Sequence, residues 1–291
     1  YNNIGFVAIK NHGLGKELQD KLYAVIRKFF SLPDDVKAKY EKPEIGFQRG
    51  YTGKGKEHAK GRNTGDLKEF YHVGQELDTI PDSDETKKEY PDNIWPSEVP
   101  EFKDIANEAY RTLEAAGKNM LKAIALYLEL DEKYFEDKVA YGNSILRQIH
   151  YFPIENPDAV PADAVRAAEH GDINLITLLM GASADGLQVL RKDGKWIPIT
   201  ALPDQLVVNV GDMLERLTNK KLKSTIHRVV NPPREMMHTS RYSIPFFMHP
   251  RSEMDLTCLG SCVDAAHPKQ FEDATAGEFL EERLRELGLK R

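Results

Sequence analysis

The apolar residues of this chain change their spacing at Ser144, and this change constrains the fold more than any other feature of the sequence. Before Ser144 they recur mainly three or four residues apart, which indicates helices, whereas through Met248 they form short runs typical of strands. Asp193-Gly194, between two of the runs, is a strong hairpin signal. The strands predicted in this part are 145–152, 170–180, 187–190, 196–199, 205–210, 224–230 and 240–248. Many short antiparallel strands without intervening helices favour a barrel or a double-sheet jelly roll.

The rest of the chain is predicted to be mostly helical, so the fold class is mainly β with flanking α. Residues 100–130 carry the longest helical pattern, with a break expected near Gly117, and their apolar face is expected to form the back wall of a sheet. Segments 43–64 and 75–98 show no steady period and are predicted to be irregular. The other predicted elements are strands at 4–9 and 67–73 and helices at 16–30, 34–40 and 275–287.

Charge and length exclude some classes of function. The 291 residues carry a net charge of -6, which argues against nucleic acid or an anionic membrane surface as the main partner. No apolar run approaches the roughly 20 residues that span a bilayer. Cys258 and Cys262 are the only cysteines, and two free thiols in a reducing cytoplasm are the favoured interpretation. We therefore expect a cytoplasmic protein whose main partner is neither nucleic acid nor a membrane, with its oligomeric state left open.

A candidate metal site lies in the predicted strands. Side chains two residues apart on a strand share a face, so His170 and Asp172 are expected to point the same way. His227, in a later β-branched run, would complete a face of two histidines and one carboxylate, which suits non-haem Fe(II). The competing interpretations are a polar strand end for the His-x-Asp pair and a core histidine for His227.

A candidate carboxylate site follows on the last predicted strand, where Arg241 and Ser243 share a face. A guanidinium binds a carboxylate through two parallel hydrogen bonds, and a hydroxyl nearby adds a third. A structural salt bridge is the alternative for Arg241. Beside a metal site, we favour the carboxylate of a bound substrate or cosubstrate.

Taken together in chain order, these segments resemble the isopenicillin N synthase-like group of Fe(II)/2-oxoglutarate-dependent oxygenases. The resemblance covers nearly the whole chain. The matching pieces are Gly5-Phe6 with Asn11-His12-Gly13, His170-Gly171-Asp172 with Leu175-Ile176-Thr177, Leu187-Gln188-Val189, Asn209-Val210-Gly211-Asp212, Leu217-Thr218-Asn219, His227-Arg228-Val229 and Arg241-Tyr242-Ser243-Ile244-Pro245-Phe246-Phe247.

The resemblance implies a double-stranded β-helix core, a cupin-like jelly roll. Fe(II) would be held by His170, Asp172 and His227, and the distal carboxylate of 2-oxoglutarate would be bound by Arg241 and Ser243. With O2, such an enzyme converts 2-oxoglutarate to succinate and oxidises a C–H bond, by hydroxylation or desaturation of a small molecule. The chemistry is centred on iron, so no separate acid or base is assigned.

The resemblance also implies a single oxygenase domain that occupies the whole of residues 1–291. Its parts are a helix-rich N-terminal part (1–143), the jelly-roll core with the iron site (144–250), and a C-terminal segment with a helix (251–291).

Strand alternation extends the predicted pocket. His150 is expected to contact the cosubstrate or the substrate, with a core histidine as the alternative. If His150 faces inward, Gln148 and Phe152 face inward too, and Phe247 shares the face of Arg241. Plant members of the family have Asn-Tyr-Tyr-Pro where this chain has His150-Tyr151-Phe152-Pro153, so Phe152 is expected to replace the tyrosine hydroxyl that contacts 2-oxoglutarate.

Other functions within and outside the family stay open. Isopenicillin N synthase uses no 2-oxoglutarate, but its Arg-Ala-Gly-Tyr-Tyr segment corresponds here to Gln48-Arg49-Gly50-Tyr51-Thr52, which disfavours a tripeptide cyclase. An ethylene-forming enzyme and a non-catalytic binding module are further alternatives. The specificity elements are expected in 43–64, in 75–98 and in the C-terminal region.

Overall fold

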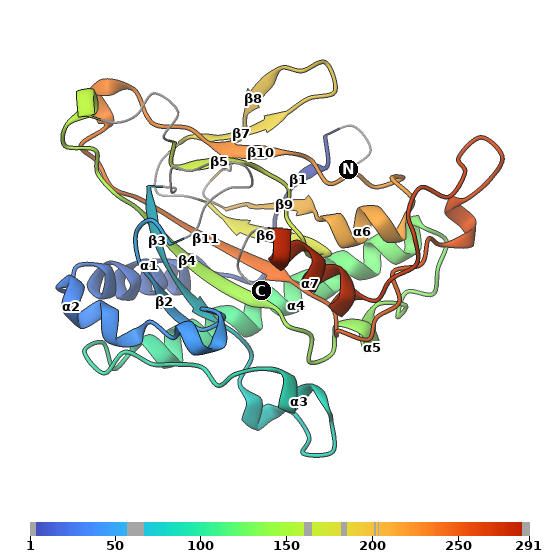
Figure 1. The fold of residues 1–291 in the computed structure, drawn as a ribbon, viewed down its shortest axis with the longest axis horizontal. Coiled ribbons are helices and arrows are strands. Elements are labelled where there is room, and N and C mark those ends of the chain that lie inside the picture. Colours follow the sequence, from blue (N-terminus) through green and yellow to red (C-terminus); the bar gives the residue numbers. More distant parts are fainter. Residues whose placement is uncertain are drawn as a thin grey trace.

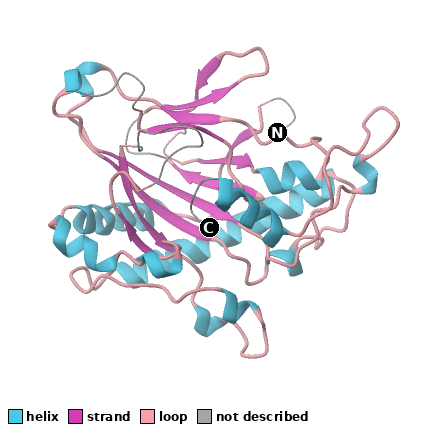
Figure 2. Cartoon of the chain, viewed as in Figure 1, coloured by secondary structure: helices cyan, strands magenta, loops and turns pink. Residues whose placement is uncertain are grey.

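Two antiparallel sheets face each other, and helices cover the outer face of the larger one (Figures 1 and 2). The computed structural model describes residues 4–56, 67–159, 165–181, 185–200, 202 and 204–286. In this part of the chain the larger sheet has the strand order β1-β9-β6-β11-β4-β3-β2, and the smaller has β5-β10-β7-β8. The predicted fold class, mainly β with flanking helices, is confirmed.

The strands differ in places from the sequence prediction. Their bounds are β1 Phe6–Ile9, β2 Gly50–Thr52, β3 Lys68–Val73, β4 Ile145–Tyr151, β5 Ala167–His170, β6 Ile176–Met180, β7 Leu187–Leu190, β8 Trp196–Pro198, β9 Leu206–Val210, β10 His227–Val229 and β11 Arg241–Met248. The predicted strand 170–180 is two strands, β5 and β6, which lie in different sheets. Strand β2 lies inside the segment 43–64 that was predicted to be irregular, and residues 57–64 of that segment lie outside the described residues.

Four of the helices, α1, α2, α4 and α7, match predicted ones, and α3, α5 and α6 are additions. Their bounds are α1 Lys16–Phe30, α2 Asp34–Lys37, α3 Thr86–Glu89, α4 Phe102–Tyr127, α5 Glu136–Val139, α6 Asp212–Leu217 and α7 Ala276–Glu286. Short 3-10 turns lie at Ala38–Tyr40, Pro43–Ile45, Leu77–Thr79, Pro157–Ala159, Arg234–Met236 and Gly260–Cys262. Helix α6 interrupts the part of the chain that was predicted to contain strands only.

Helix α4 forms the back wall of the larger sheet, as predicted, but it is continuous through Gly117. A Cβ atom at Gly117 would lie 2.5 Å from the sulfur of Met248 and 3.3 Å from Leu178. Both neighbours belong to the sheet. The glycine therefore lets the helix approach the sheet closely, and the break expected there was wrong.

The segment 75–98 is mostly irregular, as expected, and it is held against the C-terminal part by an ion pair. Arg251 donates to both carboxylate oxygens of Asp84, at 3.0 and 3.1 Å, and the hydroxyl of Ser252 donates to Glu89 at 2.8 Å. Among the described residues, no helix has the length and apolar character needed to cross a membrane.

Candidate active site

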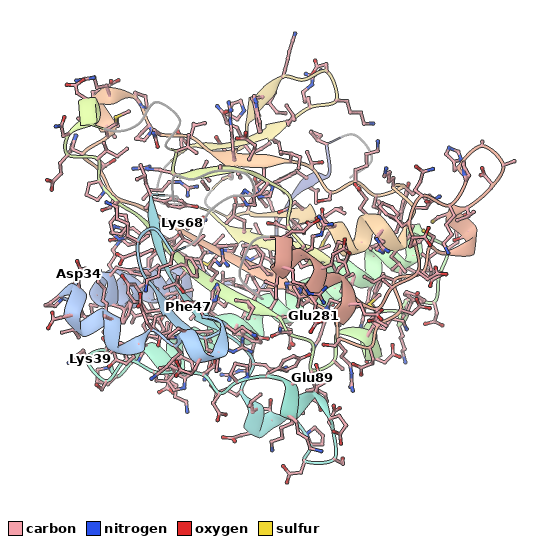
Figure 3. The ribbon with its side chains drawn as sticks, in the orientation of Figure 1. Asp34, Lys39, Phe47, Lys68, Glu89 and Glu281 are labelled. Atoms are coloured by element: carbon pink, nitrogen blue, oxygen red, sulfur yellow. The ribbon has the colours of Figure 1, made fainter. Side chains whose placement is uncertain are left out.

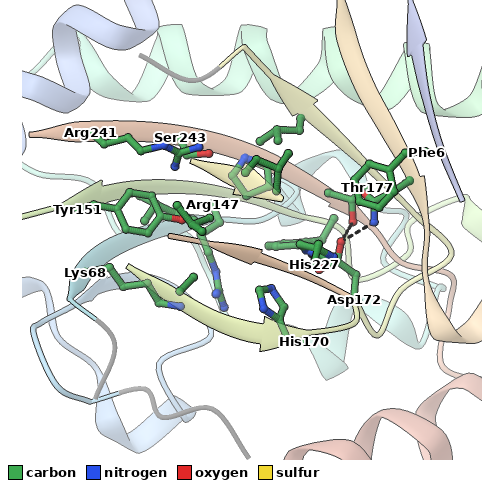
Figure 4. Close-up of a pocket in the computed structure, with 18 residues that line it drawn as sticks. Phe6, Lys68, Arg147, Tyr151, His170, Asp172, Thr177, His227, Arg241 and Ser243 are labelled. Atoms are coloured by element: carbon green, nitrogen blue, oxygen red, sulfur yellow. Dashed lines mark hydrogen bonds and ion pairs between the residues drawn. The ribbon is translucent and has the colours of Figure 1, made fainter. Parts of the chain in front are cut away.

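A pocket lies between the two sheets, and its walls carry both groups of residues singled out in the sequence (Figure 4). Its cavity volume is about 70 Å³. His170 and His227 come from β5 and β10 of the smaller sheet, and Arg241 and Ser243 come from β11 of the larger sheet. The predicted metal site and the predicted carboxylate site therefore share one cavity.

The two histidines are oriented by the same local contact. Nδ1 of His170 lies 2.7 Å from the carbonyl oxygen of Ala168, and Nδ1 of His227 lies 3.1 Å from that of Thr225. A carbonyl only accepts, so each Nδ1 carries the proton and each Nε2 keeps its lone pair. The two residues pair across β5 and β10, which brings their ring centroids to 4.4 Å.

Asp172 does not lie on a strand with His170, because β5 ends at His170 and Asp172 begins the turn to β6. The turn is fixed by backbone hydrogen bonds at the start of α6, where the N–H of Asp212 donates to the carbonyl of Asp172 at 2.7 Å. The N–H of Gly211 and that of Met213 donate to the carbonyls of Leu175 and Ile173 in the same way. The same-strand geometry inferred for His170 and Asp172 was wrong, although the two side chains do meet.

The carboxylate of Asp172 is oriented by two neighbours from the larger sheet. Thr177 donates its hydroxyl proton to Oδ2 at 2.7 Å, and the Asn209 amide donates to the same oxygen at 2.8 Å (Figure 4). Thr177 and Asn209 are directly paired across β6 and β9. With Oδ2 held in this way, Oδ1 is directed at the histidines and lies 3.7 Å from Nε2 of His227.

The donor set fits a divalent transition metal. One ligand atom from each of His170, Asp172 and His227 lies within 4.8 Å of the others. Burial would raise the pKa of Asp172, but His227, His170 and the two hydrogen bonds together hold it below its ordinary value. His170 is an exposed residue, but its imidazole ring is surrounded by protein, and this burial lowers the pKa of His170. The neighbouring His227 lowers that pKa further. A neutral imidazole and an ionised carboxylate are the forms that bind metal.

Gly211 should tolerate no side chain, because a Cβ atom there would lie 2.1 Å from the backbone oxygen of Asn174. We expect Gly211→Ala to destabilise the fold by about 1–3 kcal/mol and, by moving the Asp172 turn, to weaken Fe(II) binding about tenfold or more. Urea unfolding and anaerobic iron titration measure the two effects. Gly260→Ala is the matched control, since a Cβ there meets nothing within 4 Å. Equal iron affinity in both variants would contradict this account of the turn.

The other end of the pocket holds buried positive charge. Arg241 is 1% exposed, lies 4.9 Å from the ring centroid of Tyr151, and donates through Nε to the carbonyl of Asp185 at 3.2 Å. Arg166 is also fully buried. Its burial, and then the nearby charge of Arg241, lower the pKa of Arg166 to about 10. Ser243 is buried on the same strand as Arg241. Two buried guanidiniums therefore lie close together near this end of the pocket.

Three of the predicted pocket residues, Gln148, His150 and Phe152, do not line the pocket. Strand β4 points Arg147, Ile149 and Tyr151 into the pocket, so His150 and Gln148 lie on the opposite face, and Phe152 follows the end of the strand. The inward positions inferred for Gln148 and His150 were wrong by one residue along the strand. Phe152 was expected to take the place of a tyrosine that contacts 2-oxoglutarate. Tyr151, which lines the pocket and pairs with Arg241 across the two strands, supplies a tyrosine there. Phe247 lines the pocket.

His150 belongs instead to a buried network behind the sheet. Glu69, 1% exposed, accepts hydrogen bonds from Lys37 at 2.8 Å and Tyr51 at 2.5 Å and lies 2.7 Å from Nδ1 of His150. Nε2 of His150 lies 3.0 Å from the hydroxyl of Ser240, the residue before Arg241. Lys37 also pairs, at 3.0 Å, with Asp34, which lies at the outer surface of α2 (Figure 3). The network therefore ties α2 to the two strands that carry Tyr151 and Arg241.

Glu69→Gln should destabilise the protein by about 3 kcal/mol at pH 7, because it removes the buried ionic partner of the Lys37 ammonium and leaves it only the exposed carboxylate of Asp34. Burial would raise the pKa of Glu69, but hydrogen bonds from His150, Lys37 and Tyr51 hold it below its ordinary value of 4.5. Its stabilisation is thus present above that value and is lost as the pH falls below it.

Urea unfolding as a function of pH checks this prediction. The difference between wild type and Glu69→Gln should narrow at pH 4 and below. The control is Glu253→Gln, which breaks a largely exposed pair with Arg251 and should cost no more than about 1 kcal/mol. A pH-independent difference would show that the ionised form of Glu69 is not the stabilising one.

Sequence reasoning missed several residues of the site. Thr177 and Asn209 stood in the matched segments without a role, and Lys68, Arg147 and Tyr151 were not assigned to the pocket. The available signal was cross-strand pairing. A polar residue at an inward position of one strand, opposite a polar residue on the next, indicates a shared partner in the cavity.

Two family descriptions match the chain. Residues 1–98 match the non-haem dioxygenase in morphine synthesis N-terminal family, and residues 142–250 match the 2OG-Fe(II) oxygenase superfamily. The second range contains His170, Asp172, His227 and Arg241.

Relatives of known name and structure cover nearly the whole chain. A 2-oxoglutarate-Fe(II) type oxidoreductase of Metarhizium rileyi is 31% identical over 97% of this chain and 82% of the relative. A solved 2OG-Fe(II) oxygenase family protein from Caulobacter crescentus is 44% identical, with a TM-score of 0.87, over 98% of this chain and 90% of that one. A full-length Neurospora crassa protein, solved in complex with alpha-KG and thymine, is 30% identical with a TM-score of 0.83, over 97% and 87%.

The fold and the site define a non-haem iron oxygenase with a double-stranded β-helix core. The chain belongs to the 2OG-Fe(II) oxygenase family. It is an oxidoreductase that uses Fe(II), 2-oxoglutarate and O2 to oxidise a small molecule, as predicted, and the alternative of an oxidase without 2-oxoglutarate is not favoured.

Proposed function

We propose that His170, Asp172 and His227 hold the catalytic iron through the two Nε2 atoms and Oδ1. The observation that carries this proposal is that the three ligand atoms lie within 4.8 Å of one another, each oriented by its own hydrogen bonds. When bound, Fe(II) supplies the activation of O2 and the chelation of 2-oxoglutarate. Thr177 and Asn209 keep Asp172 ionised and oriented toward the histidines.

Arg241 and Ser243 bind the distal carboxylate of 2-oxoglutarate in this proposal. Both are buried in the same cavity as the ligands, and Tyr151 lies against Arg241. Arg166 adds a second buried positive charge close to Arg241. A dianionic cosubstrate would compensate this charge, which water cannot solvate well in the interior.

The whole chain, 1–291, would act as one oxygenase domain. The N-terminal part contributes β1, β2 and β3 to the larger sheet, and Phe6 of β1 and Lys68 of β3 line the pocket together with residues of the jelly-roll core. The substrate would be a small molecule that is hydroxylated or desaturated. The Neurospora crassa relative, which has been solved with thymine, supports such a size.

A reducing, cytoplasmic setting is part of the proposal, and two observations on the chain support it. Cys258 and Cys262 are free thiols, which persist in reducing compartments. The net charge of -6 fits a partner that is neither nucleic acid nor an anionic membrane surface.

Anaerobic reconstitution tests the proposal. The protein with Fe(II) and 2-oxoglutarate should show the weak metal-to-ligand charge-transfer band in the visible, and admission of O2 should release succinate. Bound iron without this band would contradict the cosubstrate site. A band without succinate release would favour a binding module that does not turn over.

A further inference from the structure

A second cavity lies beside the C-terminal end of α6, apart from the pocket of the iron ligands. Its volume is about 590 Å³, which is in the range of small-molecule sites. The described residues that line it do not line the active-site pocket. One wall is the turn after α6, residues 219–223, and the other is the segment 261–270, which follows β11 in the chain (Figure 1). The fold therefore provides a second concave site of suitable size.

The buried side chain of Asn219 joins the two walls of this cavity. Its amide donates to the backbone carbonyls of Cys262 at 3.0 Å and of His267 and Pro268 at 3.2 Å. Its oxygen accepts the backbone N–H of Gln270 at 2.9 Å. The backbone of Asn219 is left-handed, with φ of 47°, a conformation that asparagine adopts more readily than most residues. The walls are thus fixed relative to each other, and the cavity is preformed.

Three lysines, Lys220, Lys221 and Lys223, bring positive charge to the cavity. Within the described part of the chain, none of the three forms an ion pair. The ammonium of Lys220 lies 5.4 Å from the ring centroid of Phe271, and that of Lys221 lies 5.6 Å from the ring centroid of Tyr127. An aromatic ring attracts an ammonium without cancelling its charge. The three charges therefore remain able to bind an anion.

Two carboxylates at this site are already bonded to the backbone. Asp264 lines the cavity and accepts the N–H groups of His267 at 2.7 Å and Ala266 at 2.8 Å, which hold its pKa below the ordinary value. Glu215 of α6 accepts the N–H of Ser224 at 2.8 Å. Burial raises the pKa of Glu215, and the lysine charges only oppose this shift. Neither carboxylate forms an ion pair with the lysines, so positive charge prevails in the cavity.

We propose that this cavity binds a small soluble anion that carries two or more phosphate groups. A lysine ammonium is a compact charge suited to phosphate oxygens, and three of them match a diphosphate better than a single phosphate. Ser261, His267 and Gln270 add polar groups to the lining, which suits a ligand that forms hydrogen bonds. An anionic membrane surface is a poorer partner, because the chain as a whole carries a net charge of -6. The inference goes beyond the proposed function, since no residue of the active site takes part.

Equilibrium dialysis of the full-length protein against radiolabelled pyrophosphate, in metal-free buffer, tests the inference. Pyrophosphate should bind at least about fivefold more tightly than inorganic phosphate, because it can reach more than one ammonium. Its binding should weaken as the salt concentration rises, since the lysines are exposed. Absence of pyrophosphate binding to wild type, or equal affinities for the two anions, would overturn the inference.

A triple variant assigns the binding to the lysines. Replacing Lys220, Lys221 and Lys223 together by Gln should weaken pyrophosphate binding about tenfold, with each ammonium contributing a factor of about two to three. The fold should persist because all three side chains lie at the surface, and thermal unfolding checks this. Unchanged affinity in the triple variant would refute the site.

Two controls separate the cavity from other positive charge. The first replaces three exposed lysines of the N-terminal part by Gln, namely Lys10, Lys16 and Lys21. The second is Arg241→Ala, in the proposed cosubstrate site. Both should bind pyrophosphate within about twofold of wild type. A loss in the first as large as in the cavity variant would indicate attraction to overall charge, and a loss in the second would place pyrophosphate in the active site. Either result would overturn the inference.

Vesicles distinguish a soluble ligand from a lipid headgroup. The protein would be sedimented with phosphatidylcholine vesicles that contain or lack phosphatidic acid. We expect no sedimentation with either kind of vesicle and full binding of soluble pyrophosphate. Sedimentation with the phosphatidic acid vesicles that is lost in the triple variant, in a protein that does not bind pyrophosphate, would identify a lipid surface as the partner and overturn the inference.

Discussion

Asp172→Ala should lose more than about 100-fold in Fe(II) affinity, and its succinate release should fall to background. The substitution removes the only anionic ligand of the proposed set and leaves two neutral imidazoles, which bind a hard divalent cation weakly by themselves. The fold should persist, because among the described contacts the substitution removes only the two hydrogen bonds that Thr177 and Asn209 donate to the carboxylate. Anaerobic equilibrium dialysis with Fe(II) measures the affinity, and thermal unfolding without metal checks the fold.

Two further variants make the result specific. Asp172→Asn keeps the shape and the oxygen that accepts from Thr177 and Asn209 but removes the charge, so it should bind iron better than Asp172→Ala and far worse than wild type. Asp137→Ala removes an exposed carboxylate elsewhere and should bind iron normally. Iron affinity in Asp172→Ala equal to that of wild type would refute the ligand assignment.

The sequence was sufficient to predict the fold class and the residues at the centre of the site, but not the local geometry that brings them together. His170 and Asp172 were placed on one strand by alternation, yet Asp172 is the first residue of a turn held by the N-terminus of α6. Nothing in the spacing of apolar residues signals that helix, since its six residues are too few to show a helical period. Backbone hydrogen bonds between distant segments decided the outcome.

The errors around β4 have a different cause. The strand is buried on both faces, by the pocket on one side and by the Glu69 network on the other. Both faces of the strand therefore carry polar side chains, Arg147 and Tyr151 on one face and Gln148 and His150 on the other. The sequence pattern does not indicate which of the two faces lines the cavity. Register with β11 decides it, because Arg241 pairs with Tyr151. Long-range pairing of this kind cannot be deduced from one sequence.

Arg241→Ala should raise the concentration of 2-oxoglutarate that half-saturates the charge-transfer band by about 10- to 100-fold, the usual loss for a charge-assisted hydrogen-bonding group. Iron binding should be unchanged, because Arg241 contacts Tyr151 and the carbonyl of Asp185 rather than the ligands. Titration of the iron-loaded protein with 2-oxoglutarate under anaerobic conditions measures the shift. Arg234→Ala, an exposed arginine paired with Asp158, is the control for loss of charge.

Arg241→Lys distinguishes the fork from the charge. A lysine keeps the positive charge but cannot make two parallel bonds to a carboxylate, so its half-saturating concentration should lie between those of wild type and Arg241→Ala. If the lysine variant instead equals wild type, charge alone binds the cosubstrate, and Arg166 would share that role because it is buried close by. If all three proteins need the same concentration of 2-oxoglutarate, Arg241 is a structural residue. Its contacts with Tyr151 and Asp185 would then suffice to explain its burial.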